Sequence, residues 1–211
     1  MIIKITNEDI KDGQLDREAL AGFGADVVEV EGDKIIFKKG VEFWRYDSLT
    51  SLEGVTFNGY VEFFRCHSLA SLAGVTFNDD VDFYECWSLT SLEGATFNGC
   101  VEFYGCDSLT SVSGIAFNSD VEFMHCDFLT LVSGATFNGN VKFDYCKALS
   151  SVSSATFNGD VEFRSCNSLT SVSGAAFDGD VEFWDCNSLT SVSGATFKHG
   201  FEAKYCDNLK Q

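Results

Sequence analysis

Large apolar side chains recur along this chain with a fixed period of 20 residues from Val41 onward. Phenylalanine recurs at two positions of the repeat, here called the Phe slots. One series begins at Phe43 and the other at Phe57, and both continue at 20-residue intervals without insertion or deletion. A short period that never slips predicts stacked turns, each in contact only with its neighbours. We therefore expect a repeat solenoid in place of a single core that closes on itself.

Within one turn, the spacing of the apolar positions predicts the path of the chain. In the turn 181–200, Val181 and Phe183 alternate with Glu182 and Trp184, which predicts a short strand with an inner and an outer side. Apolar residues then follow at three-residue intervals, which indicates a curved, non-helical path and then a second short extended piece. Copies of the first strand should stack as a parallel sheet about 4.8 Å apart. The expected fold class is a mainly β solenoid with a parallel sheet on one face.

The first residues of the chain do not follow the repeat and are expected to form a small α/β cap. Residues 15–21 have a helix-forming composition, and two apolar runs on either side of residues 31–33 predict a β-hairpin. A terminal segment of a solenoid must cover an open apolar end. The predicted organisation is a cap over residues 1–36, with a short helix plus a β-hairpin, and a solenoid over residues 37–211. The solenoid comprises eight 20-residue repeats plus a partial ninth.

The repeat pattern Phe-x-x-x-Val-x-Phe-x-x-Cys-x-x-Leu-x-x-Leu/Val-x-Gly resembles a leucine-rich repeat. The hexapeptide Leu-Thr-Ser-Leu-Glu-Gly, at residues 49–54 and 89–94, is similar to short bacterial and phage repeats of that class. The resemblance covers residues from about 37 to 209, and departs in having Phe where Leu is usual, Cys in the Asn slot and no Pro. It implies a leucine-rich-repeat-like, right-handed β-solenoid that binds other proteins through its strand face.

Charge narrows the range of partners and compartments. The chain has 32 acidic and 14 basic residues, and the net charge of −18 repels nucleic acids and anionic membrane surfaces. We expect neither nucleic acid nor membrane as a partner. No stretch approaches the roughly 20 apolar residues of a membrane span, and acidic residues stand near the start where a secretory signal would be apolar. We therefore expect a cytoplasmic protein, with delivery by a non-Sec route left open.

The cysteines form a row of their own. Eight of the nine recur with the 20-residue period, from Cys66 to Cys206. One ligand per turn cannot surround a zinc ion tetrahedrally, and parallel side-chain directions disfavour the dihedral angle of a disulfide. We expect buried thiols that act as small apolar fillers in a reducing compartment. The ninth, Cys100, breaks the pattern and should point outward.

The outward side chains of the predicted strand carry the functional hypothesis. One row is acidic, and the row two residues further along each strand is largely aromatic. A solvated acidic face would account for the carboxylates and would keep solenoids apart. A contiguous stripe of exposed rings, however, usually marks a contact surface, so we expect the face to bind a protein with a basic patch around an apolar anchor. The predicted contact residues are Trp44, Phe64, Tyr84, Tyr104, Met124 and Trp184, together with Glu62, Asp82, Glu102 and Glu122.

Catalysis and small-ligand binding fit the pattern less well. A strict repeat supplies one kind of side chain again and again, and the three histidines, His67, His125 and His199, occupy three different slots. We therefore expect no enzyme and no cofactor. Rows of Thr and Ser loosely resemble the hydroxyl arrays of ice-binding solenoids, but hydroxyls bonded to the turn backbone explain them more simply. Calcium is a remote option, because no Asp-rich loop has the required Gly spacing.

A structural or self-assembling solenoid is the alternative from another class. The last repeat stops about halfway round a turn, which predicts an open strand edge and an apolar end that a homodimer could cover. Three lysines, Lys198, Lys204 and Lys210, lie in this region, and such charges hinder pairing at strand edges.

Overall fold

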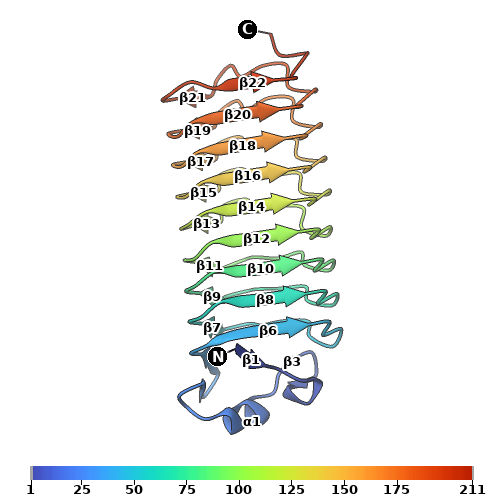
Figure 1. Cartoon of the computed structure of the whole chain (residues 1–211), viewed down its shortest axis with the longest axis vertical. Coiled ribbons are helices and arrows are strands. Elements are labelled where there is room, and N and C mark those ends of the chain that lie inside the picture. The colour runs from blue at the N-terminus through green and yellow to red at the C-terminus, as the bar shows by residue number, and fades with distance from the viewer. Residues whose placement is uncertain (1, 211) are drawn as a thin grey trace.

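A computed structural model of the chain, which describes residues 2–210, has the architecture of a β-solenoid (Figure 1). Successive turns lie one above another along the long axis, with a small helical segment at the N-terminal end. Each turn contributes one strand to each of two sheets. The prediction of a mainly β repeat solenoid built from stacked turns of 20 residues is confirmed.

The first sheet has ten strands, and its neighbouring strands are parallel throughout. From β6 onward, each residue is paired with the residue 20 positions further on, as Phe83 is with Phe103. This unslipped register aligns identical slots in columns along the axis. In spatial order the strands are β1 (Ile2–Lys4), β6 (Gly40–Trp44), β8 (Val61–Phe64), β10 (Val81–Tyr84), β12 (Val101–Tyr104), β14 (Val121–Met124), β16 (Val141–Asp144), β18 (Val161–Arg164), β20 (Val181–Trp184) and β22 (Glu202–Lys204).

A second ten-stranded sheet is built from the shorter extended piece of each turn. The sequence predicts this piece but places a sheet on only one face, so the second sheet is an addition made by the structure. Its strands are parallel except for the antiparallel pair β4 and β5. They are β4 (Val28–Glu31), β5 (Lys34–Phe37), β7 (Val55–Phe57), β9 (Thr76–Phe77), β11 (Thr96–Phe97), β13 (Ala116–Phe117), β15 (Thr136–Phe137), β17 (Thr156–Phe157), β19 (Ala176–Phe177) and β21 (Thr196–Phe197).

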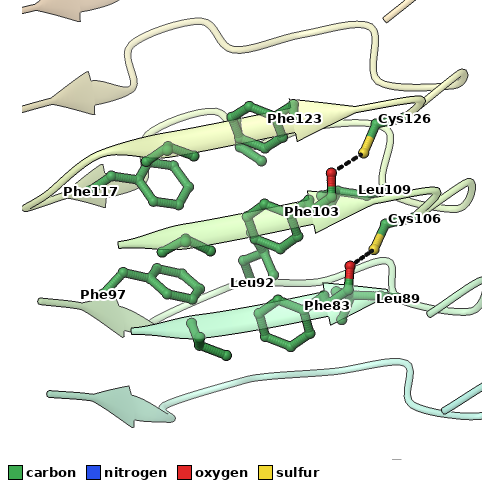
Figure 2. Packing of buried hydrophobic residues seen from close by; sticks show 14 of the residues in the cluster. Phe83, Leu89, Leu92, Phe97, Phe103, Cys106, Leu109, Phe117, Phe123 and Cys126 are labelled. Atoms are coloured by element: carbon green, nitrogen blue, oxygen red, sulfur yellow. Dashed lines mark hydrogen bonds between the residues drawn. The ribbon is translucent and has the colours of Figure 1, made fainter. Parts of the chain in front are cut away.

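The core lies between the two sheets and is dominated by two columns of phenylalanine rings (Figure 2). Rings in the same slot stack face to face, and Phe63 and Phe83 have centroids 5.0 Å apart and planes 3° apart. Rings from different slots meet edge to face, and Phe63 lies 6.4 Å from Phe77 at 89°. Each ring is therefore buried mainly by the turns above and below it. The core is continuous along the axis because every turn supplies the same shape.

The cysteine row is buried beside this core, as the period predicts. Each thiol donates a hydrogen bond to a carbonyl of the preceding turn, and Cys126 Sγ lies 3.4 Å from the oxygen of Phe103 (Figure 2). Burial raises the pKa of the Cys126 thiol to about 12. The row is buried from Cys66 to Cys186, whereas Cys206 is partly exposed and Cys100 is exposed. All nine cysteines are free thiols, and the buried ones bond consecutive turns together.

The segment before the first repeat contains a short helix and a hairpin and continues both sheets. Asp16 caps the helix, because its carboxylate accepts hydrogen bonds from the backbone of Glu18 and Ala19. β1 pairs with β6, and β5 pairs with β7, so both sheets begin in this segment. No helix within residues 2–210 has the length and apolar character needed to cross a membrane. The remaining elements are η1 (Asn7–Asp9), β2 (Ile10–Lys11), β3 (Gln14–Leu15), α1 (Arg17–Leu20) and η2 (Ala21–Phe23).

Candidate functional site

The outward side of the first sheet, here called the strand face, carries all ten predicted contact residues. From β6 to β20, the Val and Phe of each strand in this sheet point into the core, so the strand alternation directs the residues between and after them outward. Two columns result. The acidic column comprises the outward residues at positions 42, 62, 82, 102, 122, 142, 162, 182 and 202, and the aromatic column comprises those at 44, 64, 84, 104, 124, 144, 164, 184 and 204.

The aromatic column is a contiguous apolar strip over its first four turns. Trp44 and Tyr104 are exposed, with 54% and 37% of their surface accessible. Phe64 and Tyr84 are half-buried between them. The rings form two contacting pairs along the axis, with centroids 5.0 Å apart for Trp44 and Phe64 and 6.0 Å apart for Tyr84 and Tyr104, and Phe64 and Tyr84 are neighbours in the register of the sheet. The rings of each pair are tilted by 35° and 43°, and together they form a partly exposed aromatic surface.

Three adjacent carboxylates lie beside this strip in a partly desolvated setting. Burial is the main cause that raises the pKa values of Glu62, Asp82 and Glu102, and neighbouring carboxylates raise them further. The Tyr60 hydroxyl donates to Asp82 over 2.7 Å, and the Tyr84 hydroxyl donates to Glu102 over 3.1 Å. Among residues 2–210, no Lys or Arg forms an ion pair with any of the three. The negative charge here is therefore uncompensated.

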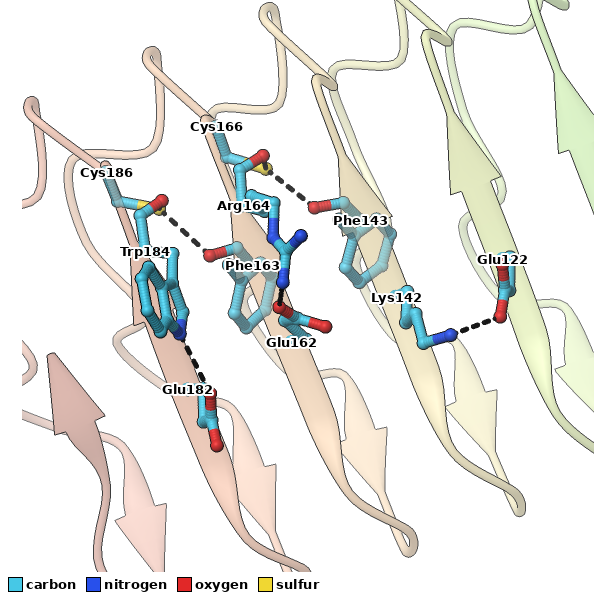
Figure 3. A network of polar contacts seen from close by, with 10 residues as sticks. All are labelled: Glu122, Lys142, Phe143, Glu162, Phe163, Arg164, Cys166, Glu182, Trp184 and Cys186. Carbon is cyan, nitrogen blue, oxygen red and sulfur yellow. Dashed lines mark hydrogen bonds and ion pairs between the residues drawn. The ribbon is translucent and has the colours of Figure 1, made fainter. Parts of the chain in front are cut away.

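The C-terminal half of the strand face has a different electrostatic character, because Lys and Arg side chains pair with carboxylates there (Figure 3). Lys142 Nζ lies 2.6 Å from Glu122, and Arg164 forms an ion pair with Glu162. Lys204 pairs with Glu202 over 3.1 Å, whereas Glu182 accepts a hydrogen bond from the neutral indole N–H of Trp184 over 2.8 Å. The strand face thus divides into an uncompensated half from β6 to β12 and a largely neutralised half from β14 onward.

This division separates the predicted contact residues into two groups. Trp44, Phe64, Tyr84, Tyr104, Glu62, Asp82 and Glu102 lie together in the uncompensated half. Met124 and Glu122 border the neutralised half, beside Lys142. Trp184 lies further along, where the guanidinium of Arg164 is 5.9 Å from its ring and the ammonium of Lys204 is 4.7 Å from it.

A further column, not singled out by the sequence reasoning, flanks the aromatic column. It is formed by the residue after each strand, which adopts a left-handed backbone conformation with φ between 51° and 59° at the non-glycine positions from 45 to 185. Arg65 lies 5.1 Å from the Phe64 ring and pairs with Glu85 over 2.6 Å, and His125 stacks on Tyr145 at 5.0 Å. The available sequence signal was variability, because this slot changes chemistry from turn to turn while the core slots stay constant.

The second sheet is followed by a ladder of asparagine side chains that was also missed. From Asn78 to Asn158, each side-chain amide nitrogen donates to the amide oxygen of the previous turn, over distances from 2.7 to 3.1 Å. Such ladders stabilise in-register stacking, so we assign them to the fold. The signal was the recurrence of Asn directly after the second Phe slot, at Asn58, Asn78, Asn98, Asn118, Asn138 and Asn158.

Two other polar rows are bonded to the backbone of neighbouring turns. Thr90 donates through its hydroxyl to the carbonyl of Ala70 over 3.2 Å, and the turn hydroxyls at 130 and 190 do likewise. Asp80, in the row beside the Val slot, accepts from the backbone N–H of Cys100 over 2.7 Å. These contacts support a role in turn stacking for both rows. No group of three or more His, Cys, Asp or Glu suited to hold a metal ion forms within the described part of the chain.

Comparison with known proteins finds no family model, no curated protein and no solved structure that matches this chain. The geometry and charge of the strand face are therefore the features that indicate a function.

Proposed function

We propose that this solenoid is a protein-interaction module that binds its partner through the uncompensated half of the strand face. The observation that carries the proposal is the contiguous aromatic strip from Trp44 to Tyr104 beside three carboxylates without a basic partner. Rings of this size contribute most of the binding energy when a partner removes them from water. A solvated acidic face alone would not require them.

The charge of the face indicates the chemistry of the partner. Glu62, Asp82 and Glu102 repel one another across neighbouring turns, and burial weakens their hydration. Lys or Arg side chains from a partner would relieve this repulsion and would speed association through electrostatic steering. The proposed partner therefore presents a basic patch around an apolar anchor. Glu122, Trp184 and the neighbouring Met124 have a lesser part in this proposal, because Lys142 pairs with Glu122, and Arg164 and Lys204 lie over the Trp184 ring. Arg65 lies over the Phe64 ring, but its charge is paired with Glu85.

We also infer that the solenoid is of the leucine-rich-repeat type. The supporting features are the short strand of alternating apolar residues and the Cys slot that follows it, whose thiols bond to backbone carbonyls as Asn does in that family. A cytoplasmic location is part of the proposal, because a long row of free thiols fits a reducing compartment.

The test replaces three rings of the strip together, as Phe64→Ser, Tyr84→Ser and Tyr104→Ser. The far-ultraviolet circular dichroism spectrum should be unchanged and the melting temperature should fall by only a few degrees, because these side chains project from the outer side of the sheet. Affinity for the natural partner, identified by cross-linking to the wild-type protein, should fall by more than tenfold.

A matched control carries three substitutions on the outer side of the other sheet, Thr76→Ala, Thr96→Ala and Thr136→Ala, and should retain full affinity. Light scattering on all three proteins checks that no change of oligomeric state through the C-terminal turn accounts for the loss. If the triple ring variant unfolds, the rings belong to the core. If it binds the partner as well as the wild type does, the proposed face is wrong.

A further inference from the structure

We propose that the part of the partner that lies on the strand face is a basic amphipathic α-helix whose axis runs along the solenoid. This inference rests on the proposed function, since it names the occupant of the same face. Three features of the strand face support a helical occupant: the spacing of the turns, the width of the two columns and the distribution of charge.

The spacing of the turns matches the pitch of a helix. The stacked rings Phe43, Phe63, Phe83 and Phe103 have successive centroid distances of 4.8, 5.0 and 5.1 Å, which together span about 15 Å. Because the register does not slip, the outward columns advance by the same steps. Three turns of an α-helix advance about 16 Å. One side chain per helical turn can therefore meet one carboxylate per solenoid turn over the whole uncompensated half.

An extended segment matches this spacing poorly. Side chains on one side of a β-strand are about 6.6 Å apart, so three steps cover about 20 Å. A strand laid along the axis would lose register with the carboxylates after its second basic residue. A strand laid across the axis would lie along a single solenoid turn and would meet only the one acidic side chain of that turn.

The two columns also fit the width of a helix. Outward residues two positions apart on a strand are separated by about 6.6 Å, and a helix with its side chains is about 10 Å across. One helical stripe of Lys or Arg would face Glu62, Asp82 and Glu102, while a neighbouring apolar stripe would cover Phe64 and Tyr84. Such adjacent stripes are the pattern of an amphipathic helix.

The distribution of charge limits the length of the strand face that a basic helix can cover. Lys142 and Arg164 extend from β16 and β18 on the same face, and both would repel a basic helix that continued beyond β14. Towards the other end, Lys4 of β1 lies beside Glu42 in the register of the sheet. Between these limits Arg65 lies over the Phe64 ring, but its charge is paired with Glu85. The favourable stretch therefore runs from about β6 to β12, which corresponds to three to four helical turns.

The test uses three synthetic peptides of identical composition and charge, about 16 residues long, built from Lys, Leu, Ala and Gln. The first places Lys and Leu in adjacent helical stripes. The second distributes the same residues evenly around the helix, and the third alternates them as in a strand. Binding to the full chain is measured by calorimetry at two salt concentrations, and the helical circular dichroism signal is followed on mixing. We expect the striped peptide to bind more than tenfold more tightly than either control and to gain helix when bound.

Two triple variants of the protein locate the contact. Glu62→Gln, Asp82→Asn and Glu102→Gln together should weaken binding of the striped peptide by more than tenfold, and their melting curves establish that they fold. The matched control neutralises the same column in the other half, as Glu162→Gln, Glu182→Gln and Glu202→Gln, and should change binding by less than twofold. Equal losses in the two variants would overturn the proposal, because they would indicate attraction by net charge alone.

The outcomes separate this inference from the proposed function. If the evenly distributed or alternating peptide binds as tightly as the striped one, while the ring variant still loses the natural partner, the helical occupant is wrong and the binding face stands. If the ring variant retains both the striped peptide and the natural partner, the binding face itself is wrong.

Discussion

Removal of one ring from the middle of the phenylalanine columns should destabilise the protein strongly. Phe103 is fully buried and is stacked between Phe83 at 5.1 Å and Phe123 at 5.2 Å. It also meets Phe97 and Phe117 edge to face, at 6.3 and 6.5 Å. The substitution Phe103→Ala removes all four aromatic contacts and leaves a cavity that the two hydrogen-bonded sheets cannot easily close. We expect the free energy of unfolding to fall by about 4 to 5 kcal/mol, the upper part of the range for replacing a buried Phe by Ala.

The same substitution in the last turn supplies a control with the same chemistry. Phe197 is only partly buried, and it contacts Phe177 at 4.9 Å and Phe201 at 5.0 Å. Because water already reaches this ring and fewer neighbours surround it, Phe197→Ala should cost about 2 kcal/mol. The expected difference between the two variants is therefore at least about 2 kcal/mol.

Urea unfolding followed by far-ultraviolet circular dichroism measures both values, provided that the slope of the transition is compared with that of the wild type. A broadened or biphasic transition for Phe103→Ala would indicate that the two halves of the solenoid unfold separately, as weak coupling between neighbouring turns allows. If the two variants lose equal stability, or if Phe103→Ala costs less than about 2 kcal/mol, the core is not the continuous stacked column described above.

Two further predictions concern ionisation and thiol chemistry. Acidification from about pH 7 towards pH 5 should raise the melting temperature. Folding raises the carboxyl pKa values of Glu62, Asp82 and Glu102 above their ordinary values of 4.5, 3.8 and 4.5. The folded state therefore binds more protons than the unfolded state in this range and is stabilised when protons are added. This gain is lost again as the pH rises through the raised pKa values, and scanning calorimetry that shows a steady fall on acidification would contradict it. A thiol reagent should label about one cysteine per native chain quickly, at the exposed Cys100, because burial raises the pKa of thiols such as Cys126 and blocks access to them. Intact-mass measurement with peptide mapping tests this, and several fast-reacting thiols would refute the buried row.

Much of the fold could be predicted from the sequence, because the pattern of residues within one repeat also determines how successive repeats stack. Alternation of Val and Phe with Glu and an aromatic residue determines which side of each strand faces inward. The unbroken 20-residue period then aligns the strands, so the burial of both Phe slots and of the cysteine row follows without further information.

The second sheet and the asparagine ladder depend on contacts between turns. Strands of two residues, such as β9 and β11, are too short for a pattern of alternation, and they are ordered only because identical pieces stack beside them. The pairing of β1 with β6 likewise joins residues 38 positions apart, as Ile3 is with Val41, outside the period of the repeat.

The candidate binding face was only partly determined by the sequence. The two outward columns follow from strand alternation, and the ten predicted residues do lie on one side of one sheet. The division of that face into an uncompensated and a neutralised half was decided by the tertiary structure, because it depends on where flexible side chains such as Lys142 and Arg164 find partners. The period of the repeat predicts which positions are neighbours on successive turns. Distances between charged atoms on neighbouring turns, and the burial that weakens their hydration, exist only once the turns are stacked.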